Sequence, residues 1–180
     1  MTTATLPTDA GEGATVFVGL GANLGDARAT LQEALAALRP LAEPGSFAAS
    51  SLYATAPVDS SGPDYVNAVA RLRTALAPHA LLDALQAIEQ RFGRERPYRN
   101  APRTLDLDVL LFGVEGDTGG RVLHDDRLTV PHPRAAQRTF VLEPLAELWP
   151  RGEIPGFGPV AELLVTARRD PSQRARRLKA

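Results

Sequence analysis

The segment LDLDVLLFG, which begins at Leu105, constrains the fold most, because it places two carboxylates inside an otherwise apolar run. Side chains alternate between the two faces of a strand, so Leu105, Leu107 and Val109 share one face. Asp106 and Asp108 share the other. Like charges at that separation repel, and each carboxylate disfavours ionisation of its neighbour. We therefore predict a strand with one face in the core and a bound cation on the other. A solvent-facing polar face is the alternative.

Hydrophobic patterning before this strand predicts an alternation of strands and helices. Asp26 is placed to cap a helix whose leucines repeat at 3.6-residue spacing, and Pro40 ends that helix. Pro78 suits the first turn of a second helix, and Gly93 suits its end. The predicted elements cover residues 15–21, 27–38, 46–57, 65–76, 78–92 and 104–113. Their βαββαβ order is that of a ferredoxin-like α/β fold, an antiparallel sheet with both helices on one face.

A C-terminal extension follows this order. Residues 113–126 are expected to form a loop or hairpin, followed by a short strand, a turn and a helix near residues 139–148. At 180 residues the chain suits one domain. From Arg168 onward it carries six basic residues and one acidic residue. The expected divisions are a flexible leader over 1–14, a domain over 15–166 and a basic tail over 167–180.

The composition limits the classes of function. With 44% hydrophobic residues, 23% charged residues and a net charge of -1, the chain can build a core and has no overall field that attracts nucleic acid or membranes. Lys179 is the only lysine, which excludes a Schiff-base or phosphate-loop lysine inside the domain; codon bias also explains the preference for arginine. The absence of cysteine excludes thiolate metal sites. The first residues lack the features of a signal peptide, so we expect a cytoplasmic protein.

The loop before the Asp-bearing strand is rich in arginine. Arginine binds phosphate oxygens bidentately and keeps its charge at any working pH. Mg²⁺ prefers few carboxylates together with substrate phosphate oxygens, so the loop and the Asp pair together favour a magnesium–nucleotide substrate. A solvated basic loop is the alternative. The loop arginines, set against a single Glu95, are Arg91, Arg94, Arg96, Arg99 and Arg103.

His132 lies between two prolines and close in sequence to Arg127, Arg134 and Arg138. A histidine held in a proline-defined turn beside arginines can donate a hydrogen bond to a phosphate. The alternative is a structural histidine, which is the commoner role of a lone histidine. The residues at this point leave both interpretations open.

Five segments, taken in their order along the chain, form a pattern that is specific to one protein family. They are GLGANLGD, SSLYATAPV, PDYVNAVARL, IEQRFGRERPYRNAPRTLDLDVLLFG and LTVPHPRAAQRTFVLEPLAEL. Together they resemble the 6-hydroxymethyl-7,8-dihydropterin pyrophosphokinase family over about residues 15 to 150. The resemblance implies a ferredoxin-like fold, in agreement with the predicted element order. It also implies transfer of the β,γ-pyrophosphoryl group of ATP to the hydroxymethyl oxygen of the pterin, with release of AMP, in folate biosynthesis.

The resemblance also implies roles for individual residues. Asp106 and Asp108 match the ligands of two Mg²⁺ ions, and Arg94 and Arg103 match the loop arginines that reach the triphosphate. The implied contacts of ATP are Leu82, Gln86, Glu89, Val109, Arg127, Thr129, His132 and Arg138. For Gln86 and Glu89 the alternative is a solvated helix face. The implied contacts of the pterin are Thr55, Ala56, Val58, Tyr65, Asn67 and Phe140.

The chain departs from the family pattern at two places. Asn100 and Ala101 stand where the family often has Trp-Gly, so Tyr98 is the candidate for the second stacking face of the pterin. Pro133 stands where the family often has Tyr.

We expect a monomer that binds ATP and a pterin, and neither nucleic acid nor membrane. Two rivals are a nucleotidyltransferase that releases pyrophosphate and an RNA-binding ferredoxin-like module. The aromatic residues that an RNA-binding module of this kind carries on its sheet are missing from this sequence.

Overall fold

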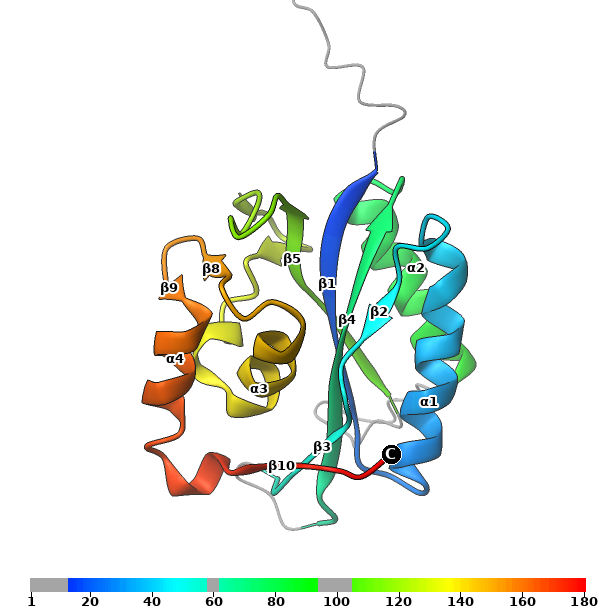
Figure 1. Ribbon diagram of the computed structural model, residues 1–180. Helices are drawn as coiled ribbons and strands as arrows, with labels where there is room; N and C mark the ends of the chain where they lie inside the picture. The colour runs from blue at the N-terminus through cyan, green and yellow to red at the C-terminus, as the bar shows by residue number, and fades with distance from the viewer. Residues whose placement is uncertain (1–12, 58–61, 94–104) are drawn as a thin grey trace, which may run out of the picture.

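An antiparallel sheet forms the centre of the protein, and its strands follow the order β10-β3-β4-β1-β5, with β2 also pairing with β4. The structure, a computed structural model, describes residues 13–57, 62–93 and 105–180. The strands of this sheet are β1 (Ala14–Ala22), β2 (Ala48–Ala49), β3 (Tyr53–Thr55), β4 (Tyr65–Thr74), β5 (Asp106–Val114) and β10 (Ala175–Arg177). Their arrangement is visible in Figure 1.

Helices cover both faces of the sheet. The first pair, α1 (Ala27–Leu38) and α2 (Pro78–Arg91), lies on one face, and α3 (Thr139–Leu148) and α4 (Val160–Ala167) lie on the other side (Figure 1). The prediction of two helices on one face, in βαββαβ order, is confirmed for this ferredoxin-like α/β fold. The short elements are η1 (Arg39–Leu41), β6 (Leu123–His124), β7 (Thr129–Val130), η2 (Ala135–Gln137), β8 (Glu153–Ile154), β9 (Gly158–Pro159) and η3 (Pro171–Gln173).

Two clusters of buried side chains hold these layers together. One lies between the sheet and the α1–α2 layer, and it includes Leu31, Leu85, Leu107 and Val109. The other lies between the sheet and the α3–α4 layer, and it includes Phe17 and Trp149, whose ring centroids are 5.3 Å apart. Alternation along the strands therefore supplies both cores, since neighbouring side chains enter opposite clusters.

The predicted ends of the first two helices agree with the structure. The Asp26 carboxylate accepts the Ala29 N–H at 3.0 Å, which caps α1 as expected. Helix α2 begins at Pro78, and Gly93 beyond its end has a positive φ of 78° that glycine adopts without strain.

The predicted second strand, residues 46–57, is two short strands instead of one. Ser50 lies between them, and its hydroxyl accepts the Val69 N–H at 2.9 Å while its own N–H donates to the Val69 carbonyl. A side-chain oxygen thus replaces a backbone carbonyl in the ladder with β4. This substitution interrupts the strand, and no periodicity in the sequence signals it.

Part of the segment predicted as a basic tail, Ala175–Arg177, forms a strand of the sheet. After α4 the chain forms η3, and β10 then pairs with β3, so that Ala175 lies opposite Thr55. Beyond β10, Leu178 N–H donates to the Leu52 carbonyl at 2.8 Å. Among the described residues, no helix combines the length and hydropathy that crossing a membrane requires.

Candidate active site

A cavity of about 460 Å³ opens beside α3, on the face of the sheet opposite α1 and α2. Its walls come from several strands and from the residues around the start of α3, and the η3 segment closes one side. The lining residues that matter most below are Gly19, Gly21, Thr55, Tyr65, Asn67, Asp106, Asp108, His132, Arg138, Phe140 and Gln173.

Asp106 and Asp108 reach this cavity together from β5. Both carboxylates are half-buried and line the cavity, while Leu107 and Val109 are buried in the opposite core. The predicted division of the strand into an apolar and an acidic face is therefore confirmed. Two acidic side chains from one strand thus offer carboxylate oxygens on one wall of the cavity. We call the wall formed by Asp106 and Asp108 the acidic wall.

Glycine forms the floor between the acidic strand and its neighbour. On β1, Gly21 pairs with Asp106 of β5 on one side and with Asn67 of β4 on the other. A Cβ atom at Gly21 would lie 3.1 Å from Asn67 Oδ1, closer than most real contacts. A Cβ atom at Gly19 would lie 3.2 Å from Leu110 Cδ2. The two glycines thus let Leu110 and Asn67 lie close to the backbone of β1, and all four residues line the cavity.

Asn67 and Thr55 form a buried polar pair beside this floor. The Asn67 amide donates from Nδ2 to Thr55 Oγ1 at 2.8 Å, and the two residues are only 4% and 5% exposed. An amide presents both a donor and an acceptor, which suits the edge of a heterocycle. The bond to Thr55 fixes the plane of the amide.

Phe140 and Arg138 stand on the α3 side of the cavity. The Arg138 guanidinium carbon lies 5.2 Å from the centroid of the Phe140 ring, within the range of a cation–π contact. Burial and the nearby Arg134 lower the pKa of Arg138, and the charges of Asp108 and Asp106 oppose that shift. Arginine stays charged nevertheless, so the site places a cation opposite two carboxylates.

His132 lies in the same electrostatic field. Burial, together with Arg138, lowers the pKa of the His132 imidazole, whereas the charge of Asp106 raises it. The Arg134 N–H donates to His132 Nδ1 at 3.2 Å, which leaves Nε2 to carry the proton of the neutral ring. The peptide bond before Pro131 is cis. His132 lines the cavity, and its Nε2–H is the donor that a phosphate oxygen could accept from.

The predicted nucleotide contacts on α2 and β5 lie elsewhere. Leu82, Gln86, Glu89 and Val109 are not among the residues that line the cavity. Val109 is buried in the core, and Glu89 is 3% exposed and accepts the Leu107 N–H at 3.2 Å. The alternative of a solvated helix face is therefore wrong for Glu89, whose carboxylate joins α2 to β5.

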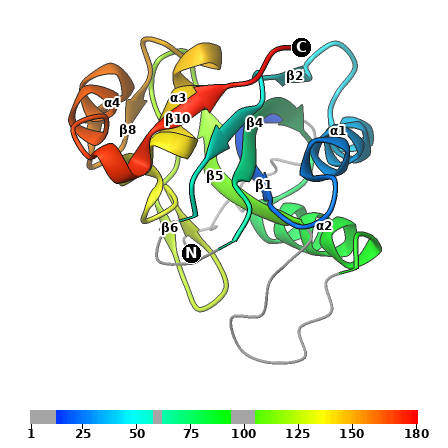
Figure 2. The same cartoon turned by 90° about the horizontal axis from the view of Figure 1, so that it is seen from below.

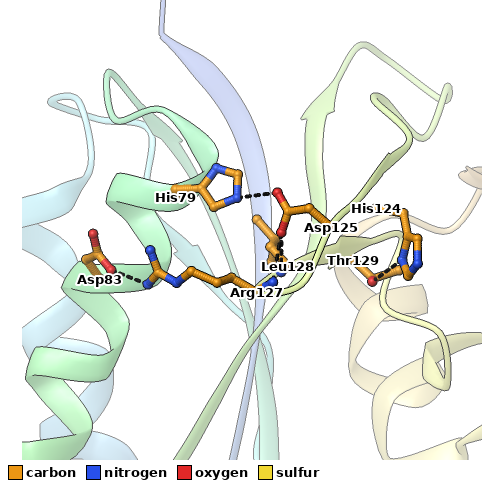
Figure 3. A network of polar contacts seen from close by, with 7 residues as sticks. All are labelled: His79, Asp83, His124, Asp125, Arg127, Leu128 and Thr129. Carbon is orange, nitrogen blue, oxygen red and sulfur yellow. Dashed lines mark hydrogen bonds and ion pairs between the residues drawn. The ribbon is translucent and has the colours of Figure 1, made fainter.

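Arg127 and Thr129 take part in a second network, which joins α2 to the β6–β7 hairpin (Figure 3). Arg127 Nη2 pairs with Asp83 Oδ1 at 2.5 Å, and Thr129 Oγ1 lies 2.8 Å from His124 Nδ1. His79, to which the sequence assigns no role, binds Asp125 Oδ2 through Nε2 at 2.6 Å. Hydrogen bonds from Arg127 N–H and Leu128 N–H, and the contact with His79, lower the pKa of Asp125.

Four predicted site residues lie outside the described residues: Val58, Arg94, Tyr98 and Arg103. Their roles stay predictions, as do those of Leu82, Gln86, Glu89, Val109, Arg127 and Thr129. The remaining predicted residues are brought together at the cavity: Thr55, Ala56, Tyr65, Asn67, Asp106, Asp108, His132, Arg138 and Phe140.

Several cavity residues were not predicted from the sequence. Gly19 and Gly21 alternate with apolar residues in a strand, a pattern that signals a close approach to the backbone. Asp170, Ser172 and Gln173 also line the cavity, although they lie far from the other site residues in sequence. No local motif announces these three.

The acidic wall suits one class of metal ion. Within residues 13–57, 62–93 and 105–180 no group of three or more His, Cys, Asp or Glu side chains could hold a metal. Mg²⁺ commonly binds through one or two carboxylates, retained waters and substrate phosphates. Asp106 and Asp108, opposite Arg138 and His132, fit a magnesium ion that arrives with a phosphate-bearing substrate.

Comparison with known proteins gives a consistent picture. The family model described as 7,8-dihydro-6-hydroxymethylpterin-pyrophosphokinase matches residues 17–150. Proteins named 2-amino-4-hydroxy-6-hydroxymethyldihydropteridine pyrophosphokinase are similar to the chain. That of Pseudomonas aeruginosa is 47% identical over 150 residues, which cover 83% of this chain and 89% of the relative. That of Haemophilus influenzae is 40% identical over 151 residues, which cover 83% and 91%.

Solved structures agree on the fold. The structure of Plasmodium falciparum HPPK-DHPS wild type with pterin and p-hydroxybenzoate superposes with a TM-score of 0.67 at 13% identity. The match covers 94% of this chain and 46% of that one, so this chain spans less than half of that longer protein. At such low identity the likeness concerns the fold alone.

Proposed function

The chain belongs to the 7,8-dihydro-6-hydroxymethylpterin-pyrophosphokinase family, and we propose that the cavity beside α3 is where it performs the reaction of that family. The enzyme transfers the pyrophosphoryl group of ATP to the hydroxymethyl group of 6-hydroxymethyl-7,8-dihydropterin, in folate biosynthesis. AMP is the other product, because the transferred group comprises the β and γ phosphates. We infer a cytoplasmic monomer.

Asp106 and Asp108 are the proposed magnesium ligands. Two ions would suit the reaction, because in-line displacement at phosphorus develops charge on both the attacking and the leaving oxygen. Bound magnesium would neutralise phosphate charge and favour ionisation of the attacking hydroxyl. The two side chains hold their positions because Leu107 and Val109 anchor β5 in the core behind them.

The pterin is proposed to bind over the glycine floor. Asn67, held by Thr55, offers in-plane hydrogen bonds to the ring, and Phe140 offers a stacking face. Tyr65 and Ala56 complete that side of the cavity. Val58 is assigned to the same slot from the sequence. This placement directs the hydroxymethyl group toward the acidic wall, because Gly21 pairs with both Asn67 and Asp106.

The phosphates are proposed to lie between the acidic wall and the start of α3. Arg138 supplies a fixed cation, and His132 supplies a neutral N–H donor from Nε2. Both groups are positioned before substrate binds, so little reorganisation accompanies the reaction. From the sequence we assign Arg94 and Arg103 to the same triphosphate. The remaining nucleotide contacts are assigned from the sequence to Leu82, Gln86, Glu89, Val109, Arg127 and Thr129.

The observation that carries this proposal is the pairing of Gly21 with both Asn67 and Asp106. This pairing sets the Asn67 amide, which is the proposed pterin contact, beside the acidic wall. The test is incubation of the protein with ATP, Mg²⁺ and 6-hydroxymethyl-7,8-dihydropterin, followed by product analysis. AMP and the pterin pyrophosphate are expected. Free pyrophosphate together with a nucleotidylated pterin would instead identify a nucleotidyltransferase.

A further inference from the structure

The segment from Asp170 to Arg177 contacts both sides of the cavity. Asp170, Ser172 and Gln173 line it next to α3, and β10 then pairs with β3, where Ala175 lies opposite Thr55. Figure 2 shows β10 crossing from the α4 side to the edge of the sheet. We call residues 170–177 the strap. It connects the side that carries Arg138 and Phe140 with the side that carries Thr55 and Asn67.

The strap caps α3 in place of a local residue. Arg138, the N-cap residue of α3, provides no side-chain capping bond. Gln173 Oε1 instead accepts the Thr139 N–H at 3.2 Å, and the Gln173 main-chain carbonyl accepts the Thr139 hydroxyl. Thr139 is only 1% exposed, so removal of these acceptors would leave buried donors without partners.

The amide of Gln173 is itself held in one orientation. Its Nε2 donates to Asp170 Oδ2 at 3.3 Å, and Asp170 Oδ1 accepts from Ser172 N and Ser172 Oγ at 3.0 and 2.6 Å. These hydrogen bonds from Ser172 and Gln173 also lower the pKa of Asp170. Because an ionised carboxylate accepts hydrogen bonds and cannot donate one, the Gln173 amide must turn its nitrogen toward Asp170. The carbonyl oxygen therefore faces Thr139.

Thr139 connects two cavity residues, because Arg138 precedes it and Phe140 follows it. The guanidinium of Arg138 lies over the Phe140 ring, and both side chains line the cavity. A shift of Thr139 would move the stacking ring and the cation together. Displacements of about 1 Å in a positioning group can lower rates on the order of 100-fold.

We propose that Gln173 is a positioning residue, which acts through Thr139 to set Phe140 for the pterin ring and Arg138 for the transferred phosphates. The inference rests on the proposed function, since it assigns both targets to substrate. It gives the basic C-terminal segment a role in positioning that rests on the hydrogen bonds of Gln173 to Thr139.

Steady-state kinetics of four variants test this inference. Gln173→Ala removes the cap and Thr139→Val removes the hydroxyl. Thr139→Ser is the conservative variant that restores the hydroxyl, and Gln32→Ala, on an exposed position of α1 outside the cavity, is the matched control. Each variant is assayed at a temperature where circular dichroism shows it fully folded. The direct binding of pterin in the presence of Mg²⁺ and a non-hydrolysable ATP analogue is measured in parallel.

Gln173→Ala and Thr139→Val should each lower kcat/KM for pterin on the order of 10- to 100-fold and weaken pterin binding. Thr139→Ser and Gln32→Ala should stay within about two-fold of the wild type. If Gln173→Ala or Thr139→Val lowers the melting temperature but keeps wild-type kcat/KM in its folded form, the bonds are merely structural and the inference is wrong. If Gln173→Ala does not fold, the comparison of Thr139→Val with Thr139→Ser decides.

The wild-type protein separates this inference from the proposed function. If it forms no AMP and no pterin pyrophosphate, the proposed function fails and the role of Gln173 in that reaction fails with it. If it forms both products while Gln173→Ala, folded, matches it in kcat/KM and pterin binding, then the inference alone fails.

Discussion

Asn67 and Thr55 form a buried polar side-chain pair, in which Asn67 Nδ2 donates to Thr55 Oγ1 at 2.8 Å. Strand β3 contributes the hydroxyl and β4 contributes the amide. The pair lies at the edge of the sheet where the strap attaches. Its bond determines which amide groups remain to face the cavity.

Replacement of Thr55 by Val should therefore weaken pterin binding. The variant keeps the shape of the side chain but leaves a buried amide N–H without its acceptor, at a cost of about 1–3 kcal/mol. That cost lowers stability, whereas binding suffers because the amide is no longer held in plane for the pterin: isothermal titration with pterin, in the presence of Mg²⁺ and an ATP analogue, should show binding weaker by roughly 10-fold, the loss of about one hydrogen bond. Thr55→Ser retains the hydroxyl and should bind like wild type. If the Thr55→Val variant and the wild type bind the pterin with equal affinity, the Asn67–Thr55 pair does not orient the amide for pterin binding.

Neutralisation of the acidic wall should abolish turnover. Asp106→Asn and Asp108→Asn each keep the shape of the side chain and remove one anionic metal ligand, so we expect kcat to fall by at least about 10²–10³-fold. The matched control is Asp117→Asn, on an exposed loop after β5. Circular dichroism should show all three variants folded. Wild-type turnover in either cavity variant would remove the proposed metal ligands from the reaction.

The glycine floor should not tolerate a methyl group. In Gly21→Ala the new Cβ would lie 3.1 Å from Asn67 Oδ1, so the amide must shift or the substrate must rise from the floor. Pterin KM should increase on the order of ten-fold, which corresponds to about 1–3 kcal/mol of overpacking. In Gly62→Ala the Cβ meets nothing within 4 Å, and KM should not change. An unchanged KM in Gly21→Ala would show that the ligand does not use this floor.

Acid should weaken the attachment of α3 to β3, because Glu147 of α3 accepts hydrogen bonds from Ser51 and Tyr53. Burial by itself would raise the pKa of this carboxyl, but hydrogen bonds from Tyr53 and Ser51 and the charge of Arg177 lower it. The bonds measure 2.7 Å from Tyr53 OH and 2.8 Å from Ser51 Oγ. A depressed folded-state pKa contributes stability above the unfolded-state pKa, and this contribution is lost as pH falls through the folded value.

Urea unfolding at pH 7 and at acidic pH measures this loss. Between about pH 5 and pH 3, wild type should lose more stability than Glu147→Gln, which has no such proton to bind. The control is Glu162→Gln, an exposed position on α4, whose acid sensitivity should match wild type. If Glu147→Gln and wild type lose stability in parallel, the carboxylate does not contribute in this way.

Local chemistry explains which parts of the fold were predictable. The two faces of β5 follow from the period of two along Leu105–Val109, and the ends of α2 follow from Pro78 and Gly93. Helix α4 and strand β10 were missed, because eight and three residues carry too little periodicity to stand out. The role of Ser50 also depends on a partner in β4, and a strand pattern cannot show that pairing.

In the candidate site, too, residues within local motifs were predictable and residues joined only by tertiary contacts were not. Asp106, Asp108 and His132 belong to contiguous motifs, so the sequence alone predicts them and the structure brings them to one cavity. Gln173 acts on Thr139 across 34 positions of the chain, and neither residue is unusual in its local context. Tertiary packing creates that relationship, and a single sequence does not encode it in any readable motif.

A crystal structure with Mg²⁺, a non-hydrolysable ATP analogue and 6-hydroxymethyl-7,8-dihydropterin tests the central claim most directly. We expect magnesium bound to Asp106 and Asp108, the phosphates beside Arg138, and the pterin ring between Asn67 and Phe140. Density for both ligands in the crystal, with the two carboxylates contacting neither metal nor substrate, would contradict the account.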